Sequence, residues 1–363
     1  MSSRERTRTL KVGSLAIGGG APVSVQTMAN ADPHDVEALA RQVESCAALG
    51  CDLIRLTVPD VEAAKALGEV KRRSPIPLVA DIHFDYRCAL AAIEAGTDAL
   101  RLNPGNIGSR DRVQAVARAA KEKGVPIRVG VNLGSLERDI AERLDGGART
   151  PARIADALVE SAMRHLALLE DEGFFDVAIS AKASDVESTL ATYRLLAERT
   201  DCPLHLGVTE AGTLIPGTVR SSVAIGILLS EGIGDTMRVS LTDAPEREVR
   251  VGMEILRSLG MKAQGPSITS CPTCGRTRAD VFKVSARVEE ELERLYLAKG
   301  RPADFPHVAV MGCAVNGPGE AKGADVALCG GEGEFLLYVG GRLVSKVREE
   351  DAVGEVMRHV VHS

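Results

Sequence analysis

Three cysteines near the C-terminus are spaced like metal ligands. Cys271 and Cys274 form a Cys-x-x-Cys pair, and Cys313 follows in the run Met-Gly-Cys-Ala-Val-Asn-Gly-Pro-Gly-Glu, which ends at Glu320. Three thiolates are one fewer than structural zinc or an ordinary cubane iron–sulfur cluster takes from its protein. The incomplete set leaves one coordination position for a weaker ligand or a substrate oxygen, which is typical of a catalytic, Lewis-acidic centre.

The surroundings of these cysteines favour an iron–sulfur cluster, although structural zinc stays open. Pro272, Gly275 and residues 316–319 are turn formers, and the backbone N–H groups of turns can point at thiolate or inorganic sulfur. The motifs lack the fourth cysteine or the histidine that structural zinc would need. The other cysteines lie in or beside apolar runs without a Cys-x-x-Cys partner, and we expect them to be small core residues. They are Cys46, Cys51, Cys88, Cys202 and Cys329.

Length and composition restrict the class of protein that holds these ligands. The 363 residues fit a barrel-sized domain followed by a small one. Hydrophobic residues make up 45% of the chain but aromatic residues only 3%, so Ala, Val, Leu and Ile must fill the core, as in parallel α/β sheets. A net charge of −6 argues against non-specific nucleic-acid binding. Without an apolar signal region or membrane span, we expect a cytoplasmic protein with no nucleic-acid or membrane partner.

Strand and helix patterns alternate up to about residue 260, which indicates repeated βα units in an α/β fold. The expected helices include 61–72, 87–95, 110–123 and 154–172. The expected strands are 23–28, 52–58, 78–83, 99–103, 127–132, 177–182, 204–210 and 237–241. A doubly wound open sheet is the competing topology. The number of strands, and the polar residues at nearly every strand end, favour a closed (β/α)8 TIM-type barrel.

Four arginines and a lysine recur at the C-terminal ends of these strands, where barrel enzymes build their active sites. Such cations would repel one another unless an anion balanced them, and guanidinium groups bind phosphate oxygens through two parallel hydrogen bonds. The sequence therefore predicts a phosphate or diphosphate site. Alternatively, each charge is a solvated rim residue or pairs with Asp81, Glu210 or Asp243. The strand-end residues are Arg55, Thr57, Asp81, His83, Arg101, Asn103, Arg128, Asn132, Ser180, Lys182, Thr209, Glu210, Arg238 and Ser240.

We expect two domains: residues 1–262 form the barrel that binds the anion, and residues 263–363 form a small α/β unit with the cysteines. The segment 261–270 contains a Gly-Pro pair and hydroxyl residues, which predicts a linker. The small domain should contain helices at 281–298 and 351–361 and strands at 308–311, 326–329, 335–339 and 342–347.

Motifs spread over nearly the whole chain resemble those of the bacterial 4-hydroxy-3-methylbut-2-enyl diphosphate (HMBPP) synthase family in its short, two-domain form. The two cysteine motifs are the most specific, and the others are residues 17–26, 80–84, 102–106, 128–132 and 207–211. The resemblance implies an iron–sulfur oxidoreductase of non-mevalonate isoprenoid (terpenoid) biosynthesis. Such an enzyme opens and reductively dehydrates 2-C-methyl-D-erythritol 2,4-cyclodiphosphate to HMBPP. One departure is Ala29, where the family usually has a threonine hydroxyl.

The resemblance also implies roles for individual residues. A [4Fe–4S] cluster would be bound by Cys271, Cys274 and Cys313, with Glu320 as a weak fourth ligand that substrate oxygen can displace. Glu210 matches the family's barrel carboxylate near the reacting carbons, so Glu210 and Glu320 are the expected catalytic residues. The expected substrate-binding residues are Arg55, Arg101, Asn103, Arg128, Asn132, Lys182, Arg238 and Ser240. Flavodoxin or ferredoxin would donate electrons, and a head-to-tail homodimer would combine the cluster domain of one chain with the barrel of the other.

Two other functions stay open on the sequence alone. Lys182 could form a Schiff base in an aldolase-like barrel, with the cysteines holding structural zinc. Alternatively, the chain could be an electron carrier or redox sensor that uses its cluster to detect oxidants. A sensor has no need of an anion pocket lined by seven strands, so the sequence favours the synthase over both alternatives.

Overall fold

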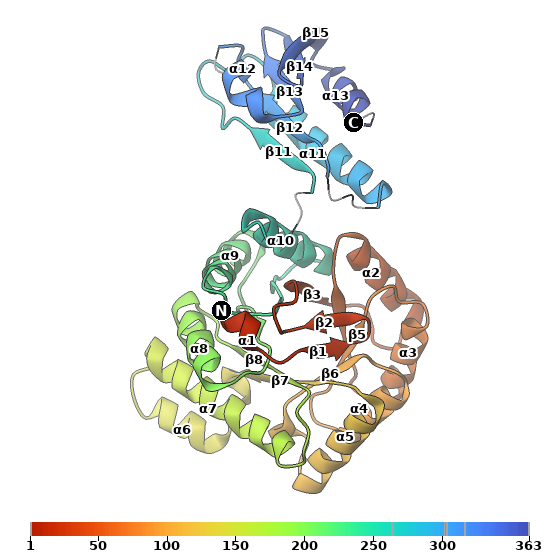
Figure 1. The fold of residues 1–363 in the computed structure, drawn as a ribbon, viewed down its shortest axis with the longest axis vertical. Helices are drawn as coiled ribbons and strands as arrows, with labels where there is room; N and C mark the ends of the chain where they lie inside the picture. The colour runs from red at the N-terminus through yellow and green to blue at the C-terminus, as the bar shows by residue number, and fades with distance from the viewer. Residues whose placement is uncertain (1, 263–264, 301, 303, 316, 362–363) are drawn as a thin grey trace. The chain divides into compact units, whose positions relative to one another are not determined.

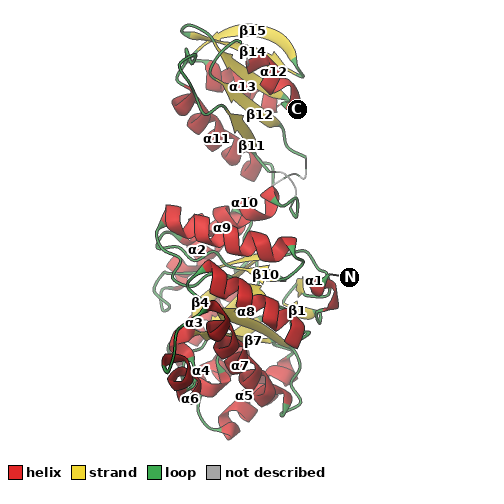
Figure 2. Ribbon diagram, turned by 90° about the vertical axis from the view of Figure 1, so that its left-hand side faces the viewer, coloured by secondary structure: helices red, strands yellow, loops and turns green. Residues whose placement is uncertain are grey.

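The computed structural model describes residues 2–262, 265–300, 302, 304–315 and 317–361, and the side chain of Glu320 is also outside the described part. The chain divides into two compact units, Met1–Met261 and Lys262–Ser363. The first contains an eight-stranded barrel and the second a five-stranded sheet (Figures 1 and 2). No helix among the described residues has the length and apolar character needed to cross a membrane.

The barrel strands run parallel and follow the chain order around the ring. They are β3 (Ser24–Met28), β4 (Leu53–Thr57), β5 (Leu78–Asp81), β6 (Ala99–Leu102), β7 (Ile127–Asn132), β8 (Val177–Lys182), β9 (His205–Leu206) and β10 (Thr236–Met237). Strands β3 to β8 pair in sequence, and β10 pairs with both β3 and β9. A bridge between Ile179 of β8 and Leu204 joins the two ends. The predicted eight-stranded barrel is confirmed, and the open sheet is wrong.

The last two barrel strands are much shorter than we predicted. The expected strands 204–210 and 237–241 form ladders only over His205–Leu206 and Thr236–Met237. Beyond them, single hydrogen bonds continue the contact, from Arg238 N–H to the Leu206 carbonyl at 3.0 Å and from Thr209 N–H to the Ala183 carbonyl at 2.9 Å. These segments leave the regular ladder earlier than their apolar pattern indicates.

Amphipathic helices surround the strands (Figure 1). Four of them begin at an aspartate whose carboxylate accepts a first-turn N–H: Asp35, Asp60, Asp85 and Asp185. Their buried faces consist mainly of Ala, Val, Leu and Ile, as the low aromatic content predicted. The helices are α2 (Val36–Ala48), α3 (Val61–Lys71), α4 (Tyr86–Glu94), α5 (Arg110–Lys123), α6 (Arg138–Asp145), α7 (Pro151–Glu170), α8 (Val186–Arg199), α9 (Leu214–Ser230) and α10 (Pro245–Ser258).

An N-terminal hairpin, which the sequence analysis did not predict, covers the N-terminal end of the barrel. A short helix α1 (Ser3–Arg6) precedes β1 (Leu10–Val12), which pairs antiparallel with β2 (Leu15–Ile17). Val12 and Ile17 pack against buried side chains of β4, β5 and β6. The hairpin thereby leaves the C-terminal ends of the strands as the accessible end of the barrel.

The second unit is a mixed sheet of β11 (Ser267–Ser270), β12 (His307–Met311), β13 (Val326–Gly330), β14 (Glu334–Val339) and β15 (Arg342–Arg348). The first three strands are parallel and the last two antiparallel. Helices α11 (Val281–Ala298) and α13 (Ala352–Val361) cover one face, where Val288 and Leu328 are buried. The short helix α12 (Gly317–Glu320) precedes a turn whose Ala321 packs against Cys329 in a separate small cluster.

One boundary in this unit differs from our prediction. Residues 267–270, which we expected to belong to the linker, form the edge strand β11. Their hydroxyl-rich sequence hid the strand, because β11 is stabilised by its parallel pairing with β12, from Ser267–His307 to Ser270–Val310, and its side chains are only partly buried. The predicted helix 281–298 has the expected bounds.

Candidate active site

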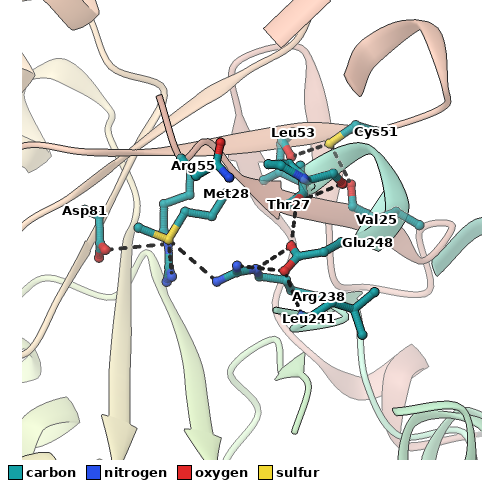
Figure 3. A network of polar contacts seen from close by, with 12 residues as sticks. Val25, Thr27, Met28, Cys51, Leu53, Arg55, Asp81, Arg238, Leu241 and Glu248 are labelled. Carbon is teal, nitrogen blue, oxygen red and sulfur yellow. Dashed lines mark hydrogen bonds and ion pairs between the residues drawn. The ribbon is translucent and has the colours of Figure 1, made fainter. Parts of the chain in front are cut away.

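Three of the predicted cations contact two buried or half-buried acceptors inside the barrel, and Figure 3 shows two of them, Arg55 and Arg238. Met28 Sδ lies 2.9 Å from Arg55 Nη2 and 3.6 Å from Arg238 Nη1. The carboxylate of Asp81 lies 3.7 Å from Arg55 Nε and 3.3 Å from Arg101 Nη1. Side chains from β3, β4, β5 and β6 and from the residue after β10 therefore share one network, as strand ends in a parallel barrel should.

Burial and mutual repulsion perturb the groups of this network. Burial lowers the pKa of Arg55 to about 10, and Arg238 and Arg101 act in the same direction. Burial opposes ionisation of Asp81, but Arg55, Arg101 and His83 outweigh it, so the pKa of Asp81 lies below its ordinary value. Asp81 is thus a buried carboxylate that partly balances the cations.

Arg128 is a buried cation with unused hydrogen-bonding capacity. Its side chain is buried, and Nη1 lies 3.2 Å from Nδ1 of His205. Its Nε and Nη2 are buried without a hydrogen-bond partner among the described residues. An unfilled, buried guanidinium donor is costly unless a ligand satisfies it, and an anion is the ligand that best fits the fork of Nε and Nη2.

Two glycines make room for the cations. A Cβ at Gly207 would stand 2.6 Å from Nζ of Lys182, and a Cβ at Gly130 would overlap the guanidinium of Arg101, which donates to the Gly130 carbonyl at 3.2 Å. Burial, together with the charges of nearby arginines, lowers the pKa of Lys182 well below its ordinary value. These close approaches explain why glycine occupies two of the motif positions noted in the sequence.

The remaining predicted residues have different environments. Asn103 is buried, and neither its amide nitrogen nor its amide oxygen has a partner among the described residues. Asn132 ends β7, where its N–H donates to Ser135 Oγ at 3.0 Å, and Ser240 is half-buried after β10. Glu210 is exposed in a turn four residues past β9 and makes no hydrogen bond or ion pair to the cations in the described part of the chain.

Three residues of this network were absent from our predicted site. Met28 and His205 lie within strands, and no role was assigned to them from the sequence. Glu248 is buried on α10 and accepts hydrogen bonds from Arg238. A usable signal existed for Glu248, because it lies four residues before Gly252 and eight before Leu256, on the helix face that packs against the barrel.

The cysteines of the second unit lie at the C-terminal ends of two neighbouring strands. Cys271 follows β11 and Cys313 follows β12 after one residue. The Cys271 N–H donates to the Val310 carbonyl at 3.2 Å, and the Gly312 N–H donates to Cys271 Sγ at 3.1 Å. Parallel pairing thus brings together two residues that are far apart in sequence, and backbone N–H groups already point at a thiol.

The two groups of cysteines differ in exposure and acidity. Cys271 and Cys313 are partly exposed and Cys274 is exposed, and hydrogen bonds from Arg276 lower the pKa of Cys274. The other five are buried. Burial raises the pKa of Cys46 to about 12. It also raises the pKa of three other buried thiols, those of Cys51, Cys88 and Cys202. Thiolates are the form that binds metal, so the donor set of the second unit fits a metal group and the buried set does not.

Both predicted sites contain a non-glycine residue with left-handed backbone. Within the described chain, Glu210 (φ 52°) and Thr273 (φ 64°) are the non-glycine residues with positive φ. Thr273 lies inside the Cys-x-x-Cys turn. Such conformations cost about 1–3 kcal/mol each and cluster at functional sites. The strain supports a functional role for both turns.

Among the described residues, no three His, Cys, Asp or Glu side chains stand close enough to hold a single metal ion. The ligands of a cubane cluster bind different iron atoms and therefore stand further apart than the ligands of one ion. Glu320 ends α12, but its side chain lies outside the described part of the structure.

The models of two domains of one known family match this chain. Residues 7–253 match the GcpE TIM-barrel domain, and residues 267–362 match the GcpE protein C-terminal domain. The chain belongs to the GcpE family. The resemblance found in the motifs is therefore confirmed, and it covers both units of this GcpE chain.

Curated relatives of this GcpE chain are similar over nearly its full length. The protein of Ruminiclostridium cellulolyticum is 50% identical over 98% of both chains, and that of Geobacter sulfurreducens is 51% identical over 98% of both. Both are named 4-hydroxy-3-methylbut-2-en-1-yl diphosphate synthase (flavodoxin). A solved structure, the dihydropteroate synthase of Yersinia pestis, covers 69% of this chain and 97% of its own, with 14% identity and a TM-score of 0.47.

Proposed function

We propose that this chain is an HMBPP synthase, which reduces and dehydrates 2-C-methyl-D-erythritol 2,4-cyclodiphosphate while opening its ring. The relatives that are about 50% identical carry this activity in their names. The observation that carries the proposal is the group of five barrel cations, in which Arg128 keeps two buried donors without a partner among the described residues. Neither rival function accounts for the family match.

The diphosphate would bind at the C-terminal end of the barrel. Arg55, Arg101, Arg128, Lys182 and Arg238 outnumber Asp81 and Glu248, the carboxylates that contact them among the described residues. A polyanion would remove this imbalance, and its oxygens would fill the open guanidinium donors of Arg128. Asn103 would complete the set. Its buried amide nitrogen and oxygen have no hydrogen-bond partner among the described residues, so both can contact substrate.

Glu210 and Glu320 would act near the reacting carbons. Glu210 is exposed on a strained turn, where it is accessible to a substrate held by the cations. In this position Glu210 would act as a general acid or base toward the bound substrate. As a carboxylate, Glu320 would be the weakest and most exchangeable of the proposed cluster ligands.

The cofactor that fits the cysteines is a [4Fe–4S] cluster bound by Cys271, Cys274 and Cys313, with Glu320 as fourth ligand. When bound, such a cluster supplies electrons one at a time and a Lewis-acidic iron. The chain's own contribution would be the three accessible thiols and N–H groups such as that of Gly312. A flavodoxin, as in the names of the relatives, is the proposed electron donor, with ferredoxin as the alternative.

We also propose a head-to-tail homodimer in the cytoplasm. The dimer follows from the resemblance to the family, and the location follows from the sequence. Residues 259–266 connect α10 to β11, and so short a connection restricts the reach of the second unit.

Anaerobic turnover tests the proposed function. Protein with a reconstituted cluster should convert the cyclic diphosphate to HMBPP with reduced flavodoxin, as measured by mass spectrometry of the product. A Cys271→Ser variant should still bind inorganic pyrophosphate but should make no product, because only the cysteine unit is altered. Iron-loaded wild-type protein that binds the cyclic diphosphate yet never yields HMBPP would contradict the proposal.

A further inference from the structure

Glu248 occupies a position behind the anion site. It lies in the first turns of α10, and its side chain is only 3% exposed. Its Oε2 accepts hydrogen bonds from Arg238 Nε at 3.0 Å and Thr27 Oγ1 at 2.6 Å. Its Oε1 accepts from Arg238 Nη2 and from the Leu241 backbone N–H, both at 3.0 Å. The carboxylate is therefore saturated by protein donors and is not available to bind substrate directly.

The Glu248–Arg238 pair fixes the direction of the guanidinium. The carboxylate takes Nε and Nη2 in a two-pronged contact, which leaves Nη1 near Met28 Sδ on the other side (Figure 3). Met28 Sδ also contacts Arg55. Because a bidentate pair restricts the guanidinium plane, Arg238 is held next to Arg55 before any anion arrives.

The same carboxylate also holds the chain that follows β10. The Leu241 N–H bonded to Glu248 is one residue from Ser240, a predicted substrate contact. Thr27, on β3, anchors the other carboxylate oxygen and is completely buried. Glu248 therefore connects strand β3, the guanidinium of Arg238 and the segment that carries Ser240.

We propose that Glu248 is a positioning residue for diphosphate binding, which aligns Arg238 through its carboxylate and Ser240 through the Leu241 N–H. The proposal rests on the proposed function, because it takes Arg238 and Ser240 as diphosphate contacts. Pre-aligned donors bind an anion more tightly, since less side-chain and loop entropy is lost on binding. Asp81 plays the corresponding part for Arg55 and Arg101, with contacts of 3.7 and 3.3 Å.

Calorimetric titration of the full-length protein with inorganic pyrophosphate tests this role. In Glu248→Gln the side chain keeps its size, but its amide N–H₂ cannot accept from Arg238, Thr27 or Leu241. We expect the affinity to fall about tenfold, the effect of misaligning one charge-assisted hydrogen bond to the anion. If Glu248→Gln does not fold, Thr27→Val, which removes only one anchor of the carboxylate, should still weaken binding.

Asp235→Asn is the matched control. Asp235 is also a buried carboxylate, and it accepts from the Leu204 N–H at 2.9 Å and from Thr7 Oγ1 at 3.0 Å. It precedes β10, at the end of this strand opposite to Arg238. Both variants should lower the free energy of unfolding, but only Glu248→Gln should weaken pyrophosphate binding. Equal affinities in the two variants would mean that Glu248 is merely structural.

A double-mutant cycle separates this inference from the proposed function. If Glu248 acts through Arg238, Glu248→Gln should weaken binding less in an Arg238→Ala background than in wild type. An equal loss in both backgrounds, or tighter binding by Glu248→Gln alone, would overturn the positioning role. If Arg238→Ala itself binds pyrophosphate like wild type, the assignment of Arg238 to the anion site fails. If Arg238→Ala weakens binding but Glu248→Gln does not, only the inference fails.

Discussion

The guanidinium of Arg128 and the imidazole of His205 form a buried contact inside the barrel, with Nη1 3.2 Å from Nδ1. Arginine has no acceptor, so His205 must present the lone pair of a neutral ring at Nδ1. Burial and the neighbouring cations Arg128 and Lys182 lower the pKa of His205 well below its ordinary value of 6.5. Protonation of His205 would place a second buried cation against Arg128.

This contact predicts a pH dependence of stability. Below pH 6.5 the unfolded chain protonates His205 while the folded chain does not, so the free energy of unfolding should fall with falling pH until the folded pKa is reached. The loss is about 1.4 kcal/mol per pH unit. His205→Asn keeps an acceptor but cannot titrate. Between pH 7.5 and 5.5, the free energy of unfolding measured in urea should therefore fall less in this variant than in wild type. Equal losses in both proteins would show that His205 does not titrate in this window.

Arg128 should contribute strongly to anion binding. Arg128→Ala removes the open donors Nε and Nη2, and we expect pyrophosphate binding to weaken by about 1.5–3 kcal/mol. Arg128→Lys should recover only part, because an ammonium cannot present two parallel donors. Arg194→Ala is a control, since Arg194 pairs with Glu231 on the helices outside the barrel. Wild-type affinity in Arg128→Ala, by calorimetry, would exclude Arg128 from the site.

Gly130 should be required for the position of Arg101. A Cβ at Gly130 would overlap the Arg101 guanidinium, so Gly130→Ala should displace Arg101 and weaken pyrophosphate binding about as much as Arg101→Ala. Gly226→Ala on α9 is the control, because its Cβ would meet nothing within 4 Å and alanine favours a helix by up to about 1 kcal/mol. A Gly130→Ala protein with unchanged affinity would mean that Arg101 does not contact the anion from this position.

Iron content should separate the two groups of cysteines. Cys313→Ser removes one of three accessible thiols, and we expect the reconstituted protein to lose most of its iron and its absorbance near about 400 nm. Cys88→Ser changes a buried thiol of the barrel and should keep both. The reverse result, iron retained in Cys313→Ser and lost in Cys88→Ser, would refute the ligand assignment.

Glu320→Ala should differ from the cysteine variants, because three thiolates can still hold a cluster. We expect iron to be retained, turnover to be lost, and the Mössbauer signal of one iron to change. An unchanged spectrum would remove Glu320 from the coordination sphere.

Much of the fold followed from local patterns in the sequence. Helix α5 and strands β7 and β8 have the predicted bounds, since each combines a clear apolar period with glycine or turn residues at its ends. Strand β11 was missed because pairing with β12 stabilises it and its serines weaken its own strand signal. Tertiary pairing of this kind cannot be read from a single segment.

The site was predicted less completely than the fold. The strand-end cations were recognisable because parallel strands place their C-terminal residues together. Of the groups that orient these cations, Asp81 was named as a possible partner and does contact Arg55 and Arg101. The others were missed, because Met28 and His205 contact guanidinium groups from other strands, and Glu248 reaches Arg238 from a helix. Such partners are set by three-dimensional packing rather than by spacing in the sequence.

The proposed head-to-tail dimer predicts that two defective chains can restore each other. A Cys271→Ser chain would keep a working barrel, and a Glu210→Ala chain would keep a working cluster unit, so each should be inactive alone. In a mixed dimer, the barrel of the first would meet the cluster unit of the second. After complete subunit exchange, about a quarter of the wild-type rate should return, because half of the dimers are mixed and each has one intact site of two. If closure occurs within one chain, no mixed dimer contains an intact site. Persistent inactivity after exchange, verified by native mass spectrometry, would therefore favour a site built from a single chain.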